Sequence, residues 1–156
     1  MPSKAAVRPP KPSAHPVRDA ADALYRAAEE SCHQHHRLTR VLKHGLDDLE
    51  LEGVGEVVDL CDRILAGATT RYEEVGKAGR GADDEDLWKA ANALWMASRE
   101  YCRRHAQSDA AATRYKKHGA EQLSEISVEY ELEMSARMAL KQALGAYAKQ
   151  RPEAAP

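Results

Sequence analysis

Apolar residues recur every three or four positions over most of the chain, which is the spacing of one face of an α-helix. A first helix is predicted over 17–50. Its repeating positions are Leu24, Ala28, Ser31, His35, Leu38, Leu42, Gly45 and Leu49. Such a seam is typical of a helix packed at a small angle against its neighbours, although the centre of this seam is polar.

Glycines predict the next boundaries. Gly53 and Gly55 indicate a break, after which apolar residues from Val54 to Val75 predict a second helix. Three glycines in 76–81 then precede acidic residues at 83–86. Glycine relaxes the backbone and acidic side chains suit the positive N-terminal end of a helix, so a third helix is predicted to begin there.

The end of the third helix leaves two architectures open. A modest capping signal at 107–109 favours a fourth helix that begins near Asp109 and folds back. The fold is then all-α, an up-down four-helix bundle with long first and last helices. In the alternative, helices three and four fuse into one long rod, which favours an extended oligomer. We favour the bundle because it buries more surface within one chain.

Prolines divide the chain into three parts. Of seven prolines, five lie in 1–16 and the others are Pro152 and Pro156. A proline inside a helix costs about 3 kcal/mol, so the proline-free interior is typical of long helices. We therefore expect a flexible, basic, proline-rich tail over 1–16, a helical bundle over 17–150 and a disordered C-terminal end over 151–156.

Composition and charge narrow the class of protein. The chain is 43% hydrophobic but has no Phe, so small side chains must fill the core. A net charge of −2 gives no reason for strong attraction to nucleic acid or membranes as a whole. No apolar stretch is long enough to cross a bilayer, and three widely spaced cysteines predict reduced thiols. We expect a soluble, cytoplasmic protein with no membrane partner.

The last helix is predicted to have two apolar faces. Residues 126–134 alternate between apolar and polar, but a lone strand would have no partner, so the segment is interpreted as helical. One face is expected in the core and holds Leu123, Ile126, Tyr130, Met134 and Leu144. The other is expected to bind a protein partner or a second copy and holds Val128, Leu132, Ala139 and Ala146.

Histidines and cysteines on different helices suggest a metal site as an alternative. In an up-down bundle, four of these residues fall at broadly similar heights, and N and S ligands at one level can hold zinc or copper. The predicted ligands are His44, Cys61, His105 and His118. The competing interpretation is buried thiols beside partly exposed histidines, with no cofactor.

Basic residues gather where the third and fourth helices meet. The patch contains Arg99, Arg103, Arg104, Arg114, Lys116 and Lys117, with Arg37, Arg40 and Lys43 expected nearby. Such an end could attract an anionic partner, although ordinary ion pairs along the helices would also explain it.

A short motif adds a nuclease hypothesis. The segment from Arg99 to His105 resembles the Arg, four to six residues, His pattern of the HEPN family of helical nucleases. The resemblance covers seven residues and implies an RNase in which Arg99 and His105 act on RNA across a dimer. No phosphate-binding loop and no nucleophile triad accompany it.

The function predicted from the sequence is therefore that of a non-enzymatic interaction or adaptor protein. It would act through self-association or by binding a protein partner. A metal-binding bundle and an RNA-binding or HEPN-like protein are the two alternatives.

Overall fold

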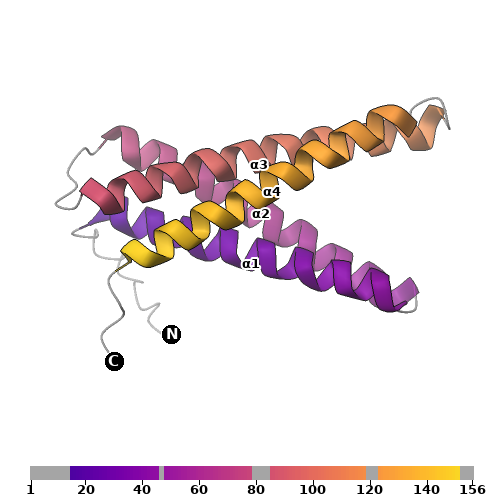
Figure 1. The fold of residues 1–156 in the computed structure, drawn as a ribbon, viewed down its shortest axis with the longest axis horizontal. Coiled ribbons are helices and arrows are strands. Elements are labelled where there is room, and N and C mark those ends of the chain that lie inside the picture. The colour runs from indigo at the N-terminus through magenta and orange to yellow at the C-terminus, as the bar shows by residue number, and fades with distance from the viewer. Residues whose placement is uncertain (1–14, 46–47, 79–84, 119–122, 152–156) are drawn as a thin grey trace, which may run out of the picture.

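The computed structural model describes residues 15–45, 48–78, 85–118 and 123–151. In these ranges the chain forms four helices and no strand: α1 (Pro16–His44), α2 (Asp48–Ala78), α3 (Glu85–His118) and α4 (Leu123–Gln150). Successive helices run in opposite directions, as Figure 1 shows. The predicted up-down four-helix bundle is thus confirmed, with α3 and α4 as separate helices.

Two helix boundaries differ from the predictions. The first helix was expected to continue to residue 50, but it ends at His44, because Gly45 adopts a left-handed conformation with φ of 65°. There the Gly45 N–H donates to the Val41 carbonyl oxygen, which is a common helix ending. Gly53 and Gly55, the predicted break, lie inside α2.

The third helix is longer than predicted. It continues through Asp109, where a fourth helix was expected to start, and ends at His118. The apolar spacing that continues past Asp109 was therefore the better guide than the weak capping signal. As predicted, the third helix begins with acidic residues, Glu85 and Asp86. Of the predicted tail over 1–16, residues 1–14 lie outside the described residues and Pro16 is the first residue of α1; 152–156 of the predicted C-terminal end also lie outside the described residues.

One half of the bundle has a continuous core to which all four helices contribute. It comprises 16–32 of α1, 65–78 of α2, 85–101 of α3 and 136–150 of α4, and we call it the closed half. Fully buried leucines from each helix meet there, and small alanines allow the close approach. Its most buried side chains include Leu24, Leu65, Leu94, Leu140 and Tyr147.

Aromatic and polar contacts fasten the last turn of α4 to α1 in the closed half. The Tyr147 hydroxyl donates to Asp22 at 2.9 Å, and its ring lies 5.4 Å from that of Tyr25. The guanidinium of Arg151 lies 4.5 Å from the centre of the Tyr25 ring, a cation–π contact. The two ends of the described chain are therefore held together.

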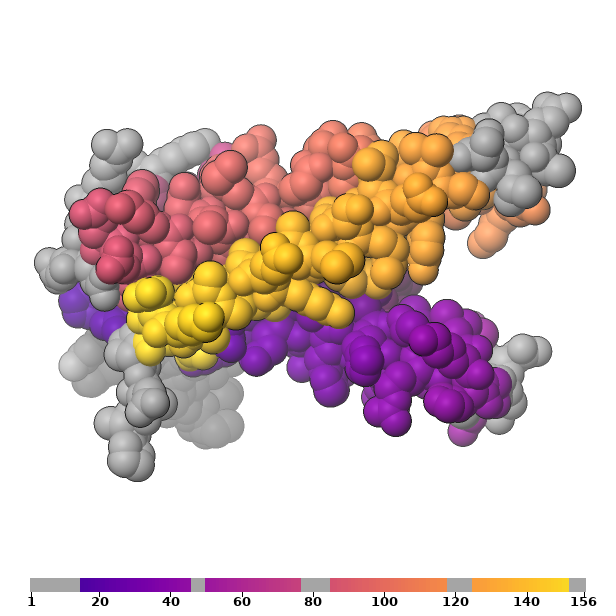
Figure 2. Space-filling view, in the orientation of Figure 1, coloured from indigo at the N-terminus to yellow at the C-terminus, as the bar shows by residue number. Residues whose placement is uncertain are grey.

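In the other half, the open half, the helices separate into two hairpins (Figure 1). One arm is the α1–α2 hairpin (33–44 and 48–64) and the other is the α3–α4 hairpin (102–118 and 123–135). Within each arm the two helices stay packed together, and the space-filling view shows the arms diverging (Figure 2). Val54, Val58 and Ala111 are buried in the arms, but none belongs to the common core.

The predicted core face of α4 was partly wrong. Tyr130 and Met134, expected in the core, lie in the open half and are 56% and 37% exposed. The observed core positions of α4 lie at Ala136, Leu140, Leu144 and Tyr147. Within the described ranges, no helix is both long enough and apolar enough to cross a membrane.

Candidate functional site

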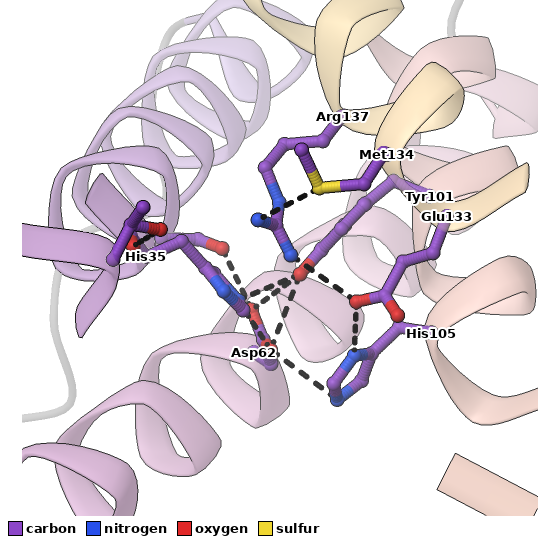
Figure 3. A network of polar contacts seen from close by, with 9 residues as sticks. His35, Asp62, Tyr101, His105, Glu133, Met134 and Arg137 are labelled. Atoms are coloured by element: carbon purple, nitrogen blue, oxygen red, sulfur yellow. Dashed lines mark hydrogen bonds and ion pairs between the residues drawn. The ribbon is translucent and has the colours of Figure 1, made fainter. Parts of the chain in front are cut away.

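A network of buried polar side chains lies where the two halves meet, and every helix contributes to it (Figure 3). Its centre is the carboxylate of Asp62 on α2, which is 7% exposed. From α1, Ser31 donates to Oδ1 of Asp62 at 2.7 Å, and Nε2 of His35 lies 2.8 Å from Oδ2. From α3, the Tyr101 hydroxyl lies 3.3 Å from both carboxylate oxygens.

The network continues from α3 to α4 through His105. Its Nε2 lies 3.4 Å from Oδ2 of Asp62, and its Nδ1 lies 2.8 Å from Oε1 of Glu133. Glu133 also accepts from Arg137 at 3.2 Å. The imidazole of His105 therefore bridges two carboxylates that belong to different arms.

The electrostatic environment favours the charged forms of these groups. The hydrogen bond to Glu133 raises the pKa of His105 although burial opposes it, and Asp62 adds to the increase. Burial raises the pKa of Glu133 and of Asp62, but hydrogen bonds and positive charges outweigh it, so both pKa values lie below the usual range. These shifts favour an imidazolium at His105 between two carboxylates.

The protonation of His35 follows from its contacts. An ionised Asp62 can only accept hydrogen bonds, so the 2.8 Å contact places a proton on Nε2 of His35. The Tyr101 hydroxyl lies 2.7 Å from the same nitrogen and donates instead to Asp62. Four donors from two helices, Ser31 and His35 on α1 and Tyr101 and His105 on α3, therefore converge on one buried carboxylate.

A cavity of about 570 Å³ opens beside the network, between α2 and α3. Its chemistry does not favour a nucleophilic enzyme. Burial raises the pKa of the Cys102 thiol to about 11 and also raises the pKa of Tyr101, so neither is ionised near neutral pH. The polar side chains that line the cavity are Asp59, Asp62, Arg63, Tyr101, His105 and Asp109.

Sequence reasoning did not identify this network. Ser31 and His35 were recognised only as members of the α1 seam, whose centre is polar. No pattern in the sequence around Asp62 indicates that this residue belongs to a buried network. The useful signal was the polar seam itself, because a polar residue in a buried position needs a partner on another helix.

The residues predicted to bind a partner lie on the surface. Val128 is 55% exposed and Leu132 is 36% exposed, and Ala139 and Ala146 are also exposed. Three further apolar side chains of α4 are exposed on a different side of the helix: Tyr130, Met134 and Met138. We call the first set, Val128, Leu132, Ala139 and Ala146, the α4 face.

Most of the predicted basic patch is already engaged in local contacts. Arg103 and Arg104 bind Glu100, Arg114 binds Glu125, and Arg99 lies over the Trp95 ring at 5.5 Å. No contact between Arg99 and His105 appears in the described structure. Six positions along a helix place two side chains on different faces, so the arrangement gives the nuclease hypothesis no support.

A second basic surface lies on the α1 arm, along one exposed stripe of the helix. It surrounds a groove of about 420 Å³. The lining residues are His33, His36, Arg37, Arg40, Val41 and His44. Within the described ranges, none of the five basic side chains among them makes an ion pair.

The proposed metal ligands lie at different levels of the bundle. His44 ends α1 and His118 ends α3, at the tips of the two diverging arms. Cys61 and His105 lie about 20 Å further along their helices. The described residues contain no group of three or more His, Cys, Asp or Glu side chains that could hold a metal ion. Zinc or copper binding stays an untested prediction.

Comparisons with protein-family models, curated proteins and solved structures find no match to this chain. The inference about function therefore depends on the fold, the buried network and the two exposed surfaces.

Proposed function

We propose that this protein is a non-enzymatic helical interaction protein that binds a protein partner or a second copy of itself through the α4 face. The observation that carries the proposal is the exposure of Val128 and Leu132, two large apolar side chains about one helical turn apart, on the arm that diverges from the rest of the bundle. Large exposed apolar patches on folded domains are typical of interaction surfaces.

The spacing along the α4 face supports docking against another helix. Val128 and Leu132 are four residues apart, and Ala139 and Ala146 continue the same side of α4. Residues with this spacing form the ridges that pack into the grooves of a neighbouring helix. The small side chains of Ala139 and Ala146 permit a close approach.

The α4 face contributes no residue to the common core of the chain. The common core takes its α4 residues from 136, 140, 144 and 147, on another side of the helix. Apolar residues that neither fill the core nor lie singly on the surface need a different explanation, and partner binding provides one.

The experiment uses a double variant, Val128→Glu with Leu132→Glu, in the full chain. We expect it to keep the wild-type helix content by circular dichroism and to lose self-association in sedimentation velocity, or to lose the stoichiometric partner that wild type retains from its source extract. The matched control is Met96→Glu, which introduces the same charge at a 59% exposed position on α3.

Two results would contradict the proposal. One is a wild-type chain that stays monomeric at high concentration and retains no protein partner. The other is an association that the double variant and the Met96 control alter equally, since the α4 face would then have no special role.

A further inference from the structure

Helix α2 carries a row of exposed apolar side chains on the side turned away from the buried network. Val57, Leu60 and Ile64 are 39%, 49% and 53% exposed, and none of them belongs to the common core. Their spacing of three and four residues places them on one side of the helix, whereas Asp62 lies on nearly the opposite side. We call these three residues the α2 stripe. It is a second apolar surface of the open half, on a different arm from the α4 face.

The identities and the spacing of these side chains are typical of a seam between two helices. In a two-stranded coiled coil, β-branched residues alternate with leucine at intervals of three and four residues. The α2 stripe has valine and isoleucine at one of these positions and leucine at the other. Gly53 and Gly67 continue the row at its two ends and are also exposed. A single helix of another molecule would therefore cover the whole stripe.

One edge of the α2 stripe carries a charge of each sign. Glu56 and Arg63 are exposed, lie along the same edge and are about two helical turns apart. Within the described ranges, neither side chain makes an ion pair. Along the other edge, Val54 and Cys61 are buried within the chain. A partner helix therefore meets charge only along the edge that contains Glu56 and Arg63.

These charges favour an antiparallel arrangement of two copies. In such a pair, Val57 of one copy can pack opposite Leu60 of the other. With this register, Glu56 of each copy lies beside Arg63 of the other. A parallel arrangement would instead place Glu56 beside Cys61, which is buried. Of the two arrangements, only the antiparallel pair joins opposite charges, and a two-fold axis makes the contact twice.

The same charges select this register. Sliding one copy along the other by one heptad keeps the apolar rows in contact, but it brings Glu56 beside Glu56 or Arg63 beside Arg63. Such contacts between like charges are unfavourable. In the favoured register, Ile64 of each copy lies over Gly53 of the other. A Cβ atom at Gly53 would meet nothing within 4 Å, so the larger side chain has room there.

We propose that two copies of this chain form a dimer through their α2 stripes, packed antiparallel, with Glu56 of each copy bound to Arg63 of the other. The assembly is closed, because both copies use the same surface. The inference goes beyond the proposed function, since it assigns the second copy to α2 and leaves the α4 face for a different protein partner.

Charge reversal tests the pairing in the full chain. Glu56→Arg alone and Arg63→Glu alone each place like charges at both contacts. Each should therefore raise the dimer dissociation constant about tenfold in sedimentation velocity at about 50 mM salt. The two variants mixed together should form a dimer of wild-type affinity, because both contacts of the mixed pair again join opposite charges. A chain that carries both substitutions should recover the dimer for the same reason.

A further variant tests the apolar stripe. Val57→Glu with Leu60→Glu should abolish the dimer at low and high salt, because charged side chains would then be buried in the seam. Met96→Glu on α3 is its matched control and should leave the dimer intact. The controls for charge reversal are Arg26→Glu on α1 and Glu131→Arg on α4, both at exposed positions. All these positions are exposed in the single chain, so circular dichroism should show wild-type helix content for every variant.

The outcomes separate this inference from the proposed function. If wild type stays monomeric at its solubility limit, the inference is overturned. If the dimer is lost with Val128→Glu and Leu132→Glu but not with the α2 variants, the inference fails while the proposed function stands. If Val57→Glu with Leu60→Glu dissociates the dimer but charge reversal and mixing have no effect, the antiparallel pairing is wrong. A dimer that is lost only with the α2 variants supports the inference, whether or not the α4 face binds a partner.

Discussion

The closed and open halves are built from the same four helices but differ in what their apolar side chains pack against. In the closed half, side chains from all four helices fill one core, and Leu24, Leu65, Leu94 and Leu140 are fully buried. In the open half, each hairpin packs only on itself, and Leu42, Leu60 and Val128 are about half exposed. The amphipathic pattern continues along the helices, but its apolar face loses its partner within the chain.

The buried network lies where this change occurs. Asp62 and Glu133 need donors from several helices, and they find them only where the arms are still close. A desolvated carboxylate without donors costs several kcal/mol, so the network fixes the register of the four helices at this level. The comparison suggests that the closed half provides stability and the open half provides surface for recognition.

The largest expected effect on stability is at Leu65 of α2 in the closed half. Leu60 of the same helix, in the open half, provides the comparison. Leu65→Ala removes a fully buried side chain from the common core and should lower the free energy of unfolding by about 3 kcal/mol. Leu60→Ala, at a position 49% exposed in the open half, should cost less than about 1 kcal/mol. Urea denaturation of both variants measures the difference. Equal costs would show that the open half has a core of its own.

Next in size is the loss of the network centre. Asp62→Asn removes a charge that accepts from Ser31 and His35 and that faces His105, so it should cost about 2–3 kcal/mol. Asp59→Asn, one turn away and exposed, is the matched control and should change stability by less than about 0.5 kcal/mol. If the two substitutions cost the same, the network does not hold the halves together.

Much of the closed half could be predicted from the sequence, and little of the junction could. The seam through Leu24, Ala28, Ser31 and His35 is buried as predicted, because a helical period identifies the face that needs cover. The same seam continues to Leu42, which is 60% exposed, because the period does not say whether a partner is present.

The network depends on information that a local pattern does not contain. Asp62 is separated by 27 residues from His35 and approaches Tyr101 across 39 residues, so only the packing of the helices brings them together. The exposure of Val128 and Leu132 was predictable because two apolar faces on one helix exceed what a small bundle can cover, whereas Tyr130 and Met134 were expected in the core. The predicted heights of the metal ligands depended on where the first loop lies. The first helix was expected to continue to residue 50, but α1 ends before Gly45.

A smaller effect is expected from pH, through His105. Its pKa is raised in the folded chain, so its stabilising contribution is complete below its ordinary value of 6.5 and is lost as pH rises through the folded value. Asp62 and Glu133 have lowered pKa values, so their contributions are complete above their ordinary values of 3.8 and 4.5 and are lost at more acidic pH. The network should therefore stabilise most between about pH 4.5 and 6.5.

The measurement compares wild type with His105→Gln in urea at pH 5.5 and pH 9. The stability difference between them should be larger at pH 5.5 and should stay below the cost of Asp62→Asn. His36→Gln, on the exposed side of α1, is the matched control and should track wild type at both values. A difference that grows towards pH 9 would mean that His105 is neutral in the folded chain.

The smallest expected effect concerns Gly45 and Gly53. The sequence predicted a helix break at Gly53, whereas in the structure the helix ends at Gly45. Gly53 lies inside α2 in the open half, and a Cβ atom there would meet nothing within 4 Å, so Gly53→Ala should stabilise the protein by about 0.5–1 kcal/mol. Gly45 has φ of 65°, and Gly45→Ala should destabilise by about 1 kcal/mol because alanine is strained there. Hydrogen exchange should show that the gain at Gly53 appears as stronger protection of 50–58, with the closed half unchanged. Opposite signs at the two positions, with the gain at Gly53, would establish that α2 is continuous through the open half and that the chain turns at Gly45, whereas destabilisation at Gly53 with stabilisation at Gly45 would return the break to Gly53.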